Sequence, residues 1–166
     1  SEMPEEFSIE SLARVCCNLI NALGTKTNIV MGHSMGGMIA QRAYDYLPEK
    51  IHGLVLSATS AAFGGRGGDW QKKFVSDRVA PLDSGLTIPE YAPTMLKNMM
   101  TPAAEGRAVD LVLQVVSLMR EETFRAAIEA ITHFEGRDVL PKMNVPVLCI
   151  AGELDLTAAP PQVMEK

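Results

Sequence analysis

The stretch from Asn28 to Gly37, with the sequence NIVMGHSMGG, constrains the fold of this chain more than any other. A short apolar run leads into the pattern G-x-S-x-G, and a segment of helical character follows. This order is typical of a nucleophile elbow, a tight turn between a strand and a helix that exposes a serine hydroxyl. We expect Gly32 and Gly36 to flank closely packed backbone and Ser34 to occupy the strained apex. The alternative is a glycine-rich turn whose serine is incidental.

Composition sets broad limits on the class of protein. The chain has 166 residues, of which 47% are hydrophobic and 21% charged, as in an ordinary globular domain. A net charge of -5 argues against nucleic acid or an acidic membrane as a partner. No apolar run is long enough to span a membrane, and the acidic first residues are unlike a signal peptide.

The cysteines and histidines bear on compartment and cofactors. Cys16, Cys17 and Cys149 lie in apolar contexts, so we expect buried free thiols in a reducing cytosol and a cytoplasmic protein. The sequence has no C-x-x-C motif and no His/Cys cluster with metal-ligand spacing, so we expect neither a metal nor another cofactor.

Periodicity places regular elements around the elbow. A strand, a helix and a strand with short links predict parallel pairing and a right-handed crossover. The segments expected are a helix capped by Ser8 and Gly24, a strand at 28–31, a helix at 35–47 ended by Pro48, and a strand at 51–58.

A long helical insertion separates the second strand from the third. It opens with the glycine-rich loop Phe63–Gly68, in which Gly64–Gly68 is a plausible hinge, and an insertion of this size usually forms a lid or a binding element. We expect helices near 69–79, 88–100, 102–120 and 121–134, a third strand at 144–151, and a terminal helix from Pro160 and Pro161. The domains expected are a core of residues 1–62 and 136–166 and an insertion of residues 63–135.

Two motifs resemble the α/β-hydrolase superfamily, and the resemblance extends over essentially the whole chain. They are GHSMGG at 32–37 and VPV at 145–147 followed by GELD at 152–155, with the serine before the aspartate. The resemblance implies an α/β class and a partial α/β-hydrolase fold of three parallel strands, flanking helices and an inserted helical cap. Residues 69–83 and 134–140 resemble carboxylesterases and lactonases of the 3-oxoadipate enol-lactonase type.

The resemblance also implies roles for single residues. Ser34 would be the nucleophile, the backbone N–H of Met35 an oxyanion donor, and Asp155 the acid that orients a histidine. A serine hydroxyl needs a base to take its proton, and the resulting imidazolium needs a carboxylate beside it. For Asp155 the alternative is an aspartate that caps a helix or a turn after the strand.

The sequence departs from the family pattern at the base. The family places its catalytic histidine after the acid, where this chain has none, so we expect no base in this chain. We expect His33 to point into the core, His52 to be exposed and His133 to lie on a helix surface. The family's earlier strands are also missing, so we expect a piece of a longer hydrolase or a truncated product. Its bare sheet edges would recruit other chains and form a homo-oligomer.

These features favour the interpretation that the protein is a serine hydrolase of small carboxylic esters or lactones that forms an acyl-enzyme on Ser34. The alternative, supported by the missing base, is a non-catalytic binding module. Residues that could line the substrate pocket are His33, Trp70, Met95 and Met99, with Phe74, Met100, Met119 and Phe124. The more conservative interpretation of the aromatic residues and methionines is that they pack the inserted helices onto each other.

Overall fold

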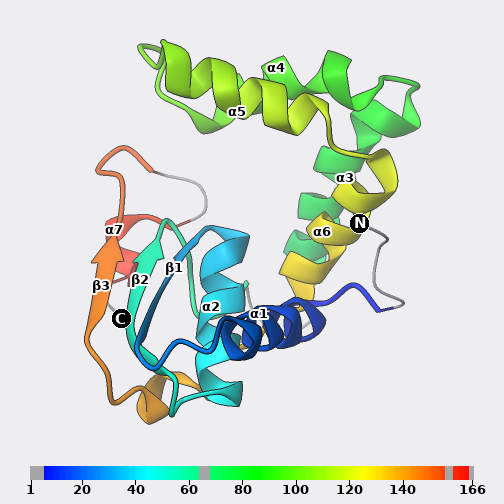
Figure 1. Ribbon diagram of the computed structural model, residues 1–166. Helices are drawn as coiled ribbons and strands as arrows, with labels where there is room; N and C mark the ends of the chain where they lie inside the picture. The colour runs from blue at the N-terminus through cyan, green and yellow to red at the C-terminus, as the bar shows by residue number, and fades with distance from the viewer. Residues whose placement is uncertain (1–5, 64–67, 156–158, 165–166) are drawn as a thin grey trace. The chain divides into compact units, whose positions relative to one another are not determined.

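A computed structural model describes residues 6–63, 68–155 and 159–164. The chain divides into two compact units, one made of Ser1–Gly65 and Ala130–Lys166, and the other of Arg66–Glu129 (Figure 1). Residues 64–67 of the expected hinge lie outside the described part of the chain.

The first unit contains a parallel three-stranded sheet in the order β1-β2-β3. Its strands are β1 at Asn28–His33, β2 at Ile51–Ser57 and β3 at Val147–Ile150. Gly32 pairs with Leu56 of β2, and Leu56 pairs with Cys149 of β3. The predicted three parallel strands are confirmed. The third strand is shorter than expected because Pro146 has no amide to donate to the ladder, although its carbonyl accepts from Leu54 at 3.0 Å.

Helices cover one face of this sheet (Figure 1). They are α1 at Ile9–Leu23, α2 at Met35–Tyr46, the 3-10 turn η1 at Leu140–Lys142, and α7 at Pro161–Met164. The predicted caps of α1 are confirmed: Ser8 forms a capping box with Ser11, and Gly24 ends the helix with φ 65°. Small residues of α1 and α2, among them Ala13, Ala40 and Ala43, allow the two helices to pack closely over Leu54 and Leu56 of β2.

The other face of the sheet is exposed. Side chains alternate along a strand, so Val30 and Gly32 of β1 face the helices, whereas Ile29, Met31 and His33 face away from them. Ile29 is 71% exposed and Met31 66%. The prediction that His33 points into the core is therefore wrong.

The prediction of buried thiols is also wrong for one cysteine. Cys149 is exposed because β3 is an edge strand and all four of its residues are exposed. Cys16 is half-buried and Cys17 is buried, and all three cysteines are free thiols.

The second unit is helical. It holds α3 at Asp69–Asp83, α4 at Ile88–Met99, α5 at Arg107–Ser117 and most of α6 at Glu121–His133, whose last turn belongs to the first unit. Its core consists of Leu82, Ile88, Phe124 and Ile128, with Phe74, Val75, Tyr91, Met95 and Met119 packed against it. None of the helices within the described ranges is long and apolar enough to cross a membrane.

Two helix boundaries in this unit differ from expectation. α3 continues through Pro81 because a proline near the end of a helix removes a single amide, and the turn still closes through the Ser84 N–H to the Ala80 carbonyl at 3.0 Å. α5 begins at Arg107 rather than at residue 102, because Gly106 has φ 96°, a conformation that interrupts a helix.

Candidate active site

Ser34 occupies a strained turn between β1 and α2. Its φ is 52° and its ψ is -121°, in a region that side chains other than glycine rarely adopt. Three contacts hold it there. The Ser34 N–H donates to the Ser57 carbonyl at 2.8 Å, while the Ser34 carbonyl accepts from the Gly37 N–H at 2.9 Å and the Thr59 hydroxyl at 2.7 Å. The end of β2 therefore fixes the backbone of the elbow.

The glycines around Ser34 have different roles. A Cβ at Gly32 would overlap the Gly36 carbonyl and lie 2.6 Å from the Gly37 Cα, and a Cβ at Gly37 would lie 2.5 Å from the Thr59 side chain. A Cβ at Gly36 would meet no atom within 4 Å. The expectation that Gly36 is required for close packing is therefore wrong, and Gly32 and Gly37 are the residues that close packing requires.

The Ser34 hydroxyl and the first two amides of α2 have no hydrogen-bond partner among the residues described. Ser34 is the N-cap residue of α2, yet its side chain makes no capping bond. Within the described part of the chain, no acceptor binds the N–H groups of Met35 and Gly36. The positive end of the α2 dipole lies at these amides. A nucleophilic oxygen placed beside free amide donors at a helix N-terminus can stabilise an oxyanion.

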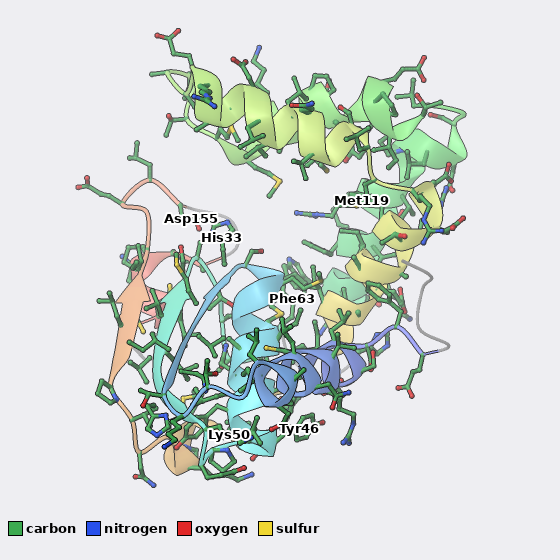
Figure 2. The ribbon with its side chains drawn as sticks, viewed as in Figure 1. His33, Tyr46, Lys50, Phe63, Met119 and Asp155 are labelled. Atoms are coloured by element: carbon green, nitrogen blue, oxygen red, sulfur yellow. The ribbon has the colours of Figure 1, made fainter. Side chains whose placement is uncertain are left out.

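The carboxyl ends of the three strands meet at this edge of the sheet. Ser34 follows β1, and the Ala58 N–H after β2 donates to the Ile150 carbonyl at the end of β3 at 2.8 Å. Asp155 follows in a tight turn, in which its N–H donates to the Gly152 carbonyl at 3.0 Å, and it is half-buried. Figure 2 shows His33 and Asp155 at the same end of the sheet.

Strand order sets the distance between the serine and the carboxylate that would assist it. β2 lies between the strands that precede Ser34 and Asp155. With a strand spacing of about 4.8 Å, β1 and β3 are roughly 10 Å apart. A carboxylate at this distance acts on a serine only through a group between them, and an imidazole is the side chain that such triads use.

The three histidines occupy other positions. His33 places its Nδ1 3.1 Å from the Ser57 hydroxyl oxygen, and His52 places its Nδ1 3.1 Å from the Lys50 carbonyl near the start of β2, at the opposite end of the sheet. His133 is exposed at the end of α6. Within the described ranges, none of them is hydrogen-bonded to the Ser34 hydroxyl.

Sequence reasoning missed the residues that support the elbow. Besides Thr59, the buried amide of Gln41 on α2 donates to the Gly37 carbonyl at 3.2 Å and to the Ser60 carbonyl at 3.1 Å. The available signal was the three hydroxyl residues Ser57, Thr59 and Ser60 at the end of a buried strand and directly after it. Hydroxyl residues at the carboxyl end of a parallel strand lie beside the elbow.

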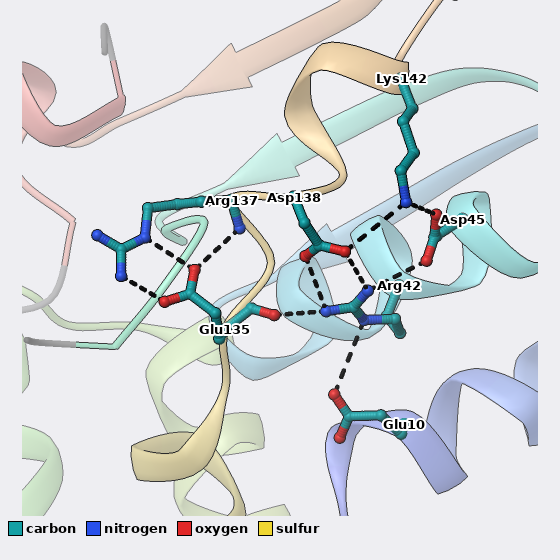
Figure 3. A network of polar contacts seen from close by, with 7 residues as sticks. All are labelled: Glu10, Arg42, Asp45, Glu135, Arg137, Asp138 and Lys142. Atoms are coloured by element: carbon teal, nitrogen blue, oxygen red, sulfur yellow. Dashed lines mark hydrogen bonds and ion pairs between the residues drawn. The ribbon is translucent and has the colours of Figure 1, made fainter. Parts of the chain in front are cut away.

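A buried arginine joins α2 to the segment that leads into β3 (Figure 3). Arg42 is 9% exposed and binds Asp45 at 3.1 Å, Asp138 at 3.3 Å and the carbonyl oxygen of Glu135. Burial by itself lowers the pKa of Arg42, but the bonds to Asp138 and Asp45 outweigh it and raise the pKa overall. The hydrogen bond from Arg42 in turn lowers the pKa of Asp138. This ionic contact fixes the start of the segment that carries Asp155.

The remaining candidates for substrate contact lie in the second unit, whereas His33 lies in the first. Trp70 on α3 is 53% exposed, and its ring centroid is 5.7 Å from that of Phe74. Met95 packs against the core of this unit, and Met99 is 61% exposed at the end of α4. Among the residues that the structure describes, no group of three histidine, cysteine or acidic side chains could hold a metal ion.

Comparison with known proteins agrees with this geometry. A family model described as the alpha/beta hydrolase fold matches residues 1–81. The pimeloyl-[acyl-carrier protein] methyl ester esterase of Pseudoalteromonas atlantica is 22% identical over 160 residues, covering 92% of this chain and 59% of that protein. A homoserine O-acetyltransferase of Thermus thermophilus is 32% identical over 121 residues, covering 72% of this chain and 28% of that protein.

Solved structures of hydrolases also match this chain. A hydrolase from Pseudomonas aeruginosa matches with a TM-score of 0.82 and 24% identity, covering 99% of this chain and 61% of that one. The enol-lactonase from Burkholderia xenovorans matches with a TM-score of 0.73 and 25% identity, covering 99% and 62%. The sheet, the elbow and these matches show that the chain has the α/β-hydrolase fold. It spans about three fifths of the length of the esterase and of these two structures.

Proposed function

We propose that the protein is a serine hydrolase of small carboxylic esters or lactones, and that Ser34 carries the acyl group. The observation that carries this proposal is the elbow, where the Ser34 hydroxyl, on a strained backbone, lies before amides of α2 that bind no acceptor among the described residues. The esterase and enol-lactonase among the similar proteins support esters and lactones as the substrate class.

In the proposed reaction, the Ser34 oxygen attacks the ester carbonyl while an imidazole accepts its proton; none of the three histidines supplies this imidazole in the part of the chain that the structure describes. The Met35 N–H binds the developing oxyanion, and Asp155 stabilises the imidazolium. The tetrahedral intermediate then expels the alcohol, which takes the proton, and water releases the acid from Ser34 in a second cycle. In a lactone the leaving alcohol is part of the same molecule.

Hydrolysis of p-nitrophenyl acetate and of a simple γ-lactone tests this proposal. Ser34→Ala should abolish turnover above the rate in buffer, because the substitution removes the hydroxyl that is proposed to carry the acyl group. Ser76→Ala, which removes an exposed hydroxyl from α3, is the matched control and should leave the rate unchanged. Equal rates in the Ser34→Ala and wild-type proteins, both without and with added imidazole, would exclude Ser34 as the nucleophile.

One observation favours a second candidate, a non-catalytic binding module. None of the three histidines is bonded to the Ser34 hydroxyl within the part of the chain that the structure describes. In this case the protein would bind esters without cleaving them. Free imidazole separates the two candidates: it should raise the rate of wild-type protein above that of Ser34→Ala if Ser34 lacks only a base, and raise both equally if the elbow only binds.

The proposal also includes a cellular compartment and an oligomeric state. We place it in the cytoplasm, because its three cysteines are free thiols. We also propose a homo-oligomer, because β1 and β3 are edge strands beside an apolar sheet face. Sedimentation velocity tests the oligomer: a monomer at all concentrations would contradict it.

A further inference from the structure

Arg78 on α3 is a half-buried cation that pairs with no carboxylate of the described residues. Its guanidinium carbon lies 3.4 Å from the centroid of the Phe74 ring, and one N–H donates to the Phe74 carbonyl at 3.5 Å, the long limit of a hydrogen bond. No ion pair involves Arg78 within the described ranges. Since a guanidinium carries five N–H donors in a planar fork, most of its bonding capacity is unused.

Nearby charges in the second unit are already paired. Arg125 on α6 binds Asp83 at 2.7 Å. Asp77, which is adjacent to Arg78 in sequence, binds Lys73 at 2.8 Å. The carboxylate closest in sequence is therefore held by another cation, and no other carboxylate in the described part of the chain forms an ion pair with Arg78.

The surroundings of Arg78 make this charge costly. Burial lowers the pKa of the Arg78 guanidinium, and the Tyr91 phenol and the Asp77 carboxylate only partly offset that effect. An arginine stays protonated in spite of such a shift. A positive charge that has lost part of its hydration is stabilised by an anion that supplies the missing hydrogen bonds.

A second unused polar group lies close by. The hydroxyl of Tyr91 on α4 has no hydrogen-bond partner among the residues described, while its ring packs edge-on against Phe124 with centroids 6.3 Å apart. Tyr91, Phe74 and Met95 are partly exposed members of one apolar cluster. A planar, singly charged carboxylate matches the guanidinium fork, and a short hydrocarbon chain matches this apolar surface.

We propose that Arg78 and Tyr91 form a binding site for the carboxylate of a small aliphatic acid or half-ester. Arg78 donates two N–H groups to the carboxylate oxygens, Tyr91 donates its hydroxyl, and the aliphatic chain lies on Phe74. The site is built from the second unit alone, so it stands independently of the hydrolase function proposed for Ser34.

The single tryptophan of the chain reports on this site. The Trp70 ring lies 5.7 Å from that of Phe74, on which Arg78 rests. Titration with glutarate should change Trp70 fluorescence in a saturable way, and the neutral analogue glutaramide should bind at least about tenfold more weakly. Arg78→Gln should weaken glutarate binding at least about tenfold, whereas Arg107→Gln, at an exposed arginine of the same unit, should leave it unchanged.

Controls keep the result interpretable. Arg78→Lys keeps the charge but loses the planar fork, so it should bind glutarate with intermediate affinity and the same melting temperature as wild type. Calorimetry measures the same binding if the fluorescence does not change. Equal affinity for glutarate and glutaramide, or unchanged glutarate affinity in Arg78→Gln, would overturn the proposal.

Steady-state kinetics separates two sources of the carboxylate. If the substrate carries it, Arg78→Gln should raise KM for mono-p-nitrophenyl glutarate and leave KM for p-nitrophenyl butyrate unchanged. If a separate ligand carries it, glutarate binding depends on Arg78 while both KM values stay the same.

Discussion

Replacing Arg42 with methionine tests the role of the ionic contact that joins α2 to the segment before β3. The buried guanidinium binds Asp45, Asp138 and the Glu135 carbonyl, with Glu10 at 3.7 Å. Asp138 and Glu10 are about half exposed and regain water when Arg42 is lost. The ion pair of each with Arg42 therefore contributes roughly 0.5 kcal/mol to the free energy of unfolding. Asp45 is 17% exposed and the Glu135 carbonyl loses a charged donor, so each costs about 1 kcal/mol.

The expected loss is therefore about 2–3 kcal/mol in the free energy of unfolding. For a chain of this size that loss lowers the melting temperature by roughly 5–10 °C. Thermal unfolding followed by circular dichroism measures it. Arg137→Met is the matched control, because Arg137 is exposed and, within the described ranges, its side chain binds only Glu135 of the same segment. It should leave the melting temperature unchanged within error.

Dependence on pH gives a second signature of the same contact. The hydrogen bond from Arg42 lowers the pKa of Asp138, so the contact stabilises the fold above the ordinary pKa of an aspartate and is lost as the pH falls through the lowered value. The difference in stability between wild type and Arg42→Met should therefore narrow as the pH falls below about 4. A melting temperature of Arg42→Met equal to that of Arg137→Met, or a difference independent of pH, would refute this reasoning.

Two further predictions follow from packing and exposure. Gly32→Ala should destabilise the protein by about 1–3 kcal/mol and abolish any turnover, because its Cβ would overlap backbone atoms. Gly36→Ala should have the stability of wild type, because a Cβ there meets no atom within 4 Å. Equal stability of the two variants in urea would contradict this prediction. Cys149 should react with a thiol reagent at pH 8 well before Cys17, because burial raises the pKa of the Cys17 thiol and Cys149 is exposed; equal rates in native protein would contradict this.

Local signals carried most of the fold. The caps at Ser8 and Gly24, the apolar runs of the strands and the proline after α2 act over a few residues, so the sequence placed these elements well. The βαβ order then required parallel strands. Boundaries were missed where a proline near a helix end cost only one hydrogen bond, as at Pro81, or where Gly106 took a positive φ.

The elbow was predictable, but what supports it was not. The motif G-x-S-x-G predicted the strained turn at Ser34. The bond from Thr59 to Ser34 joins residues 25 positions apart and the bond from Gln41 to Ser60 residues 19 positions apart, and no periodicity signals such contacts. The orientation of His33 was missed for a related reason. Whether one or both faces of a sheet are covered depends on contacts between distant parts of the chain, and the face of β1 that carries His33 is exposed.

Covalent labelling of Ser34 tests the central proposal most directly. We expect a fluorophosphonate to add one group to the native gene product, and peptide mass spectrometry to place it on the peptide that contains Ser34. The Ser34→Ala protein should remain unlabelled under the same conditions. No adduct on the wild-type protein, or an adduct of equal yield on Ser34→Ala, would contradict the proposal that Ser34 is an activated nucleophile.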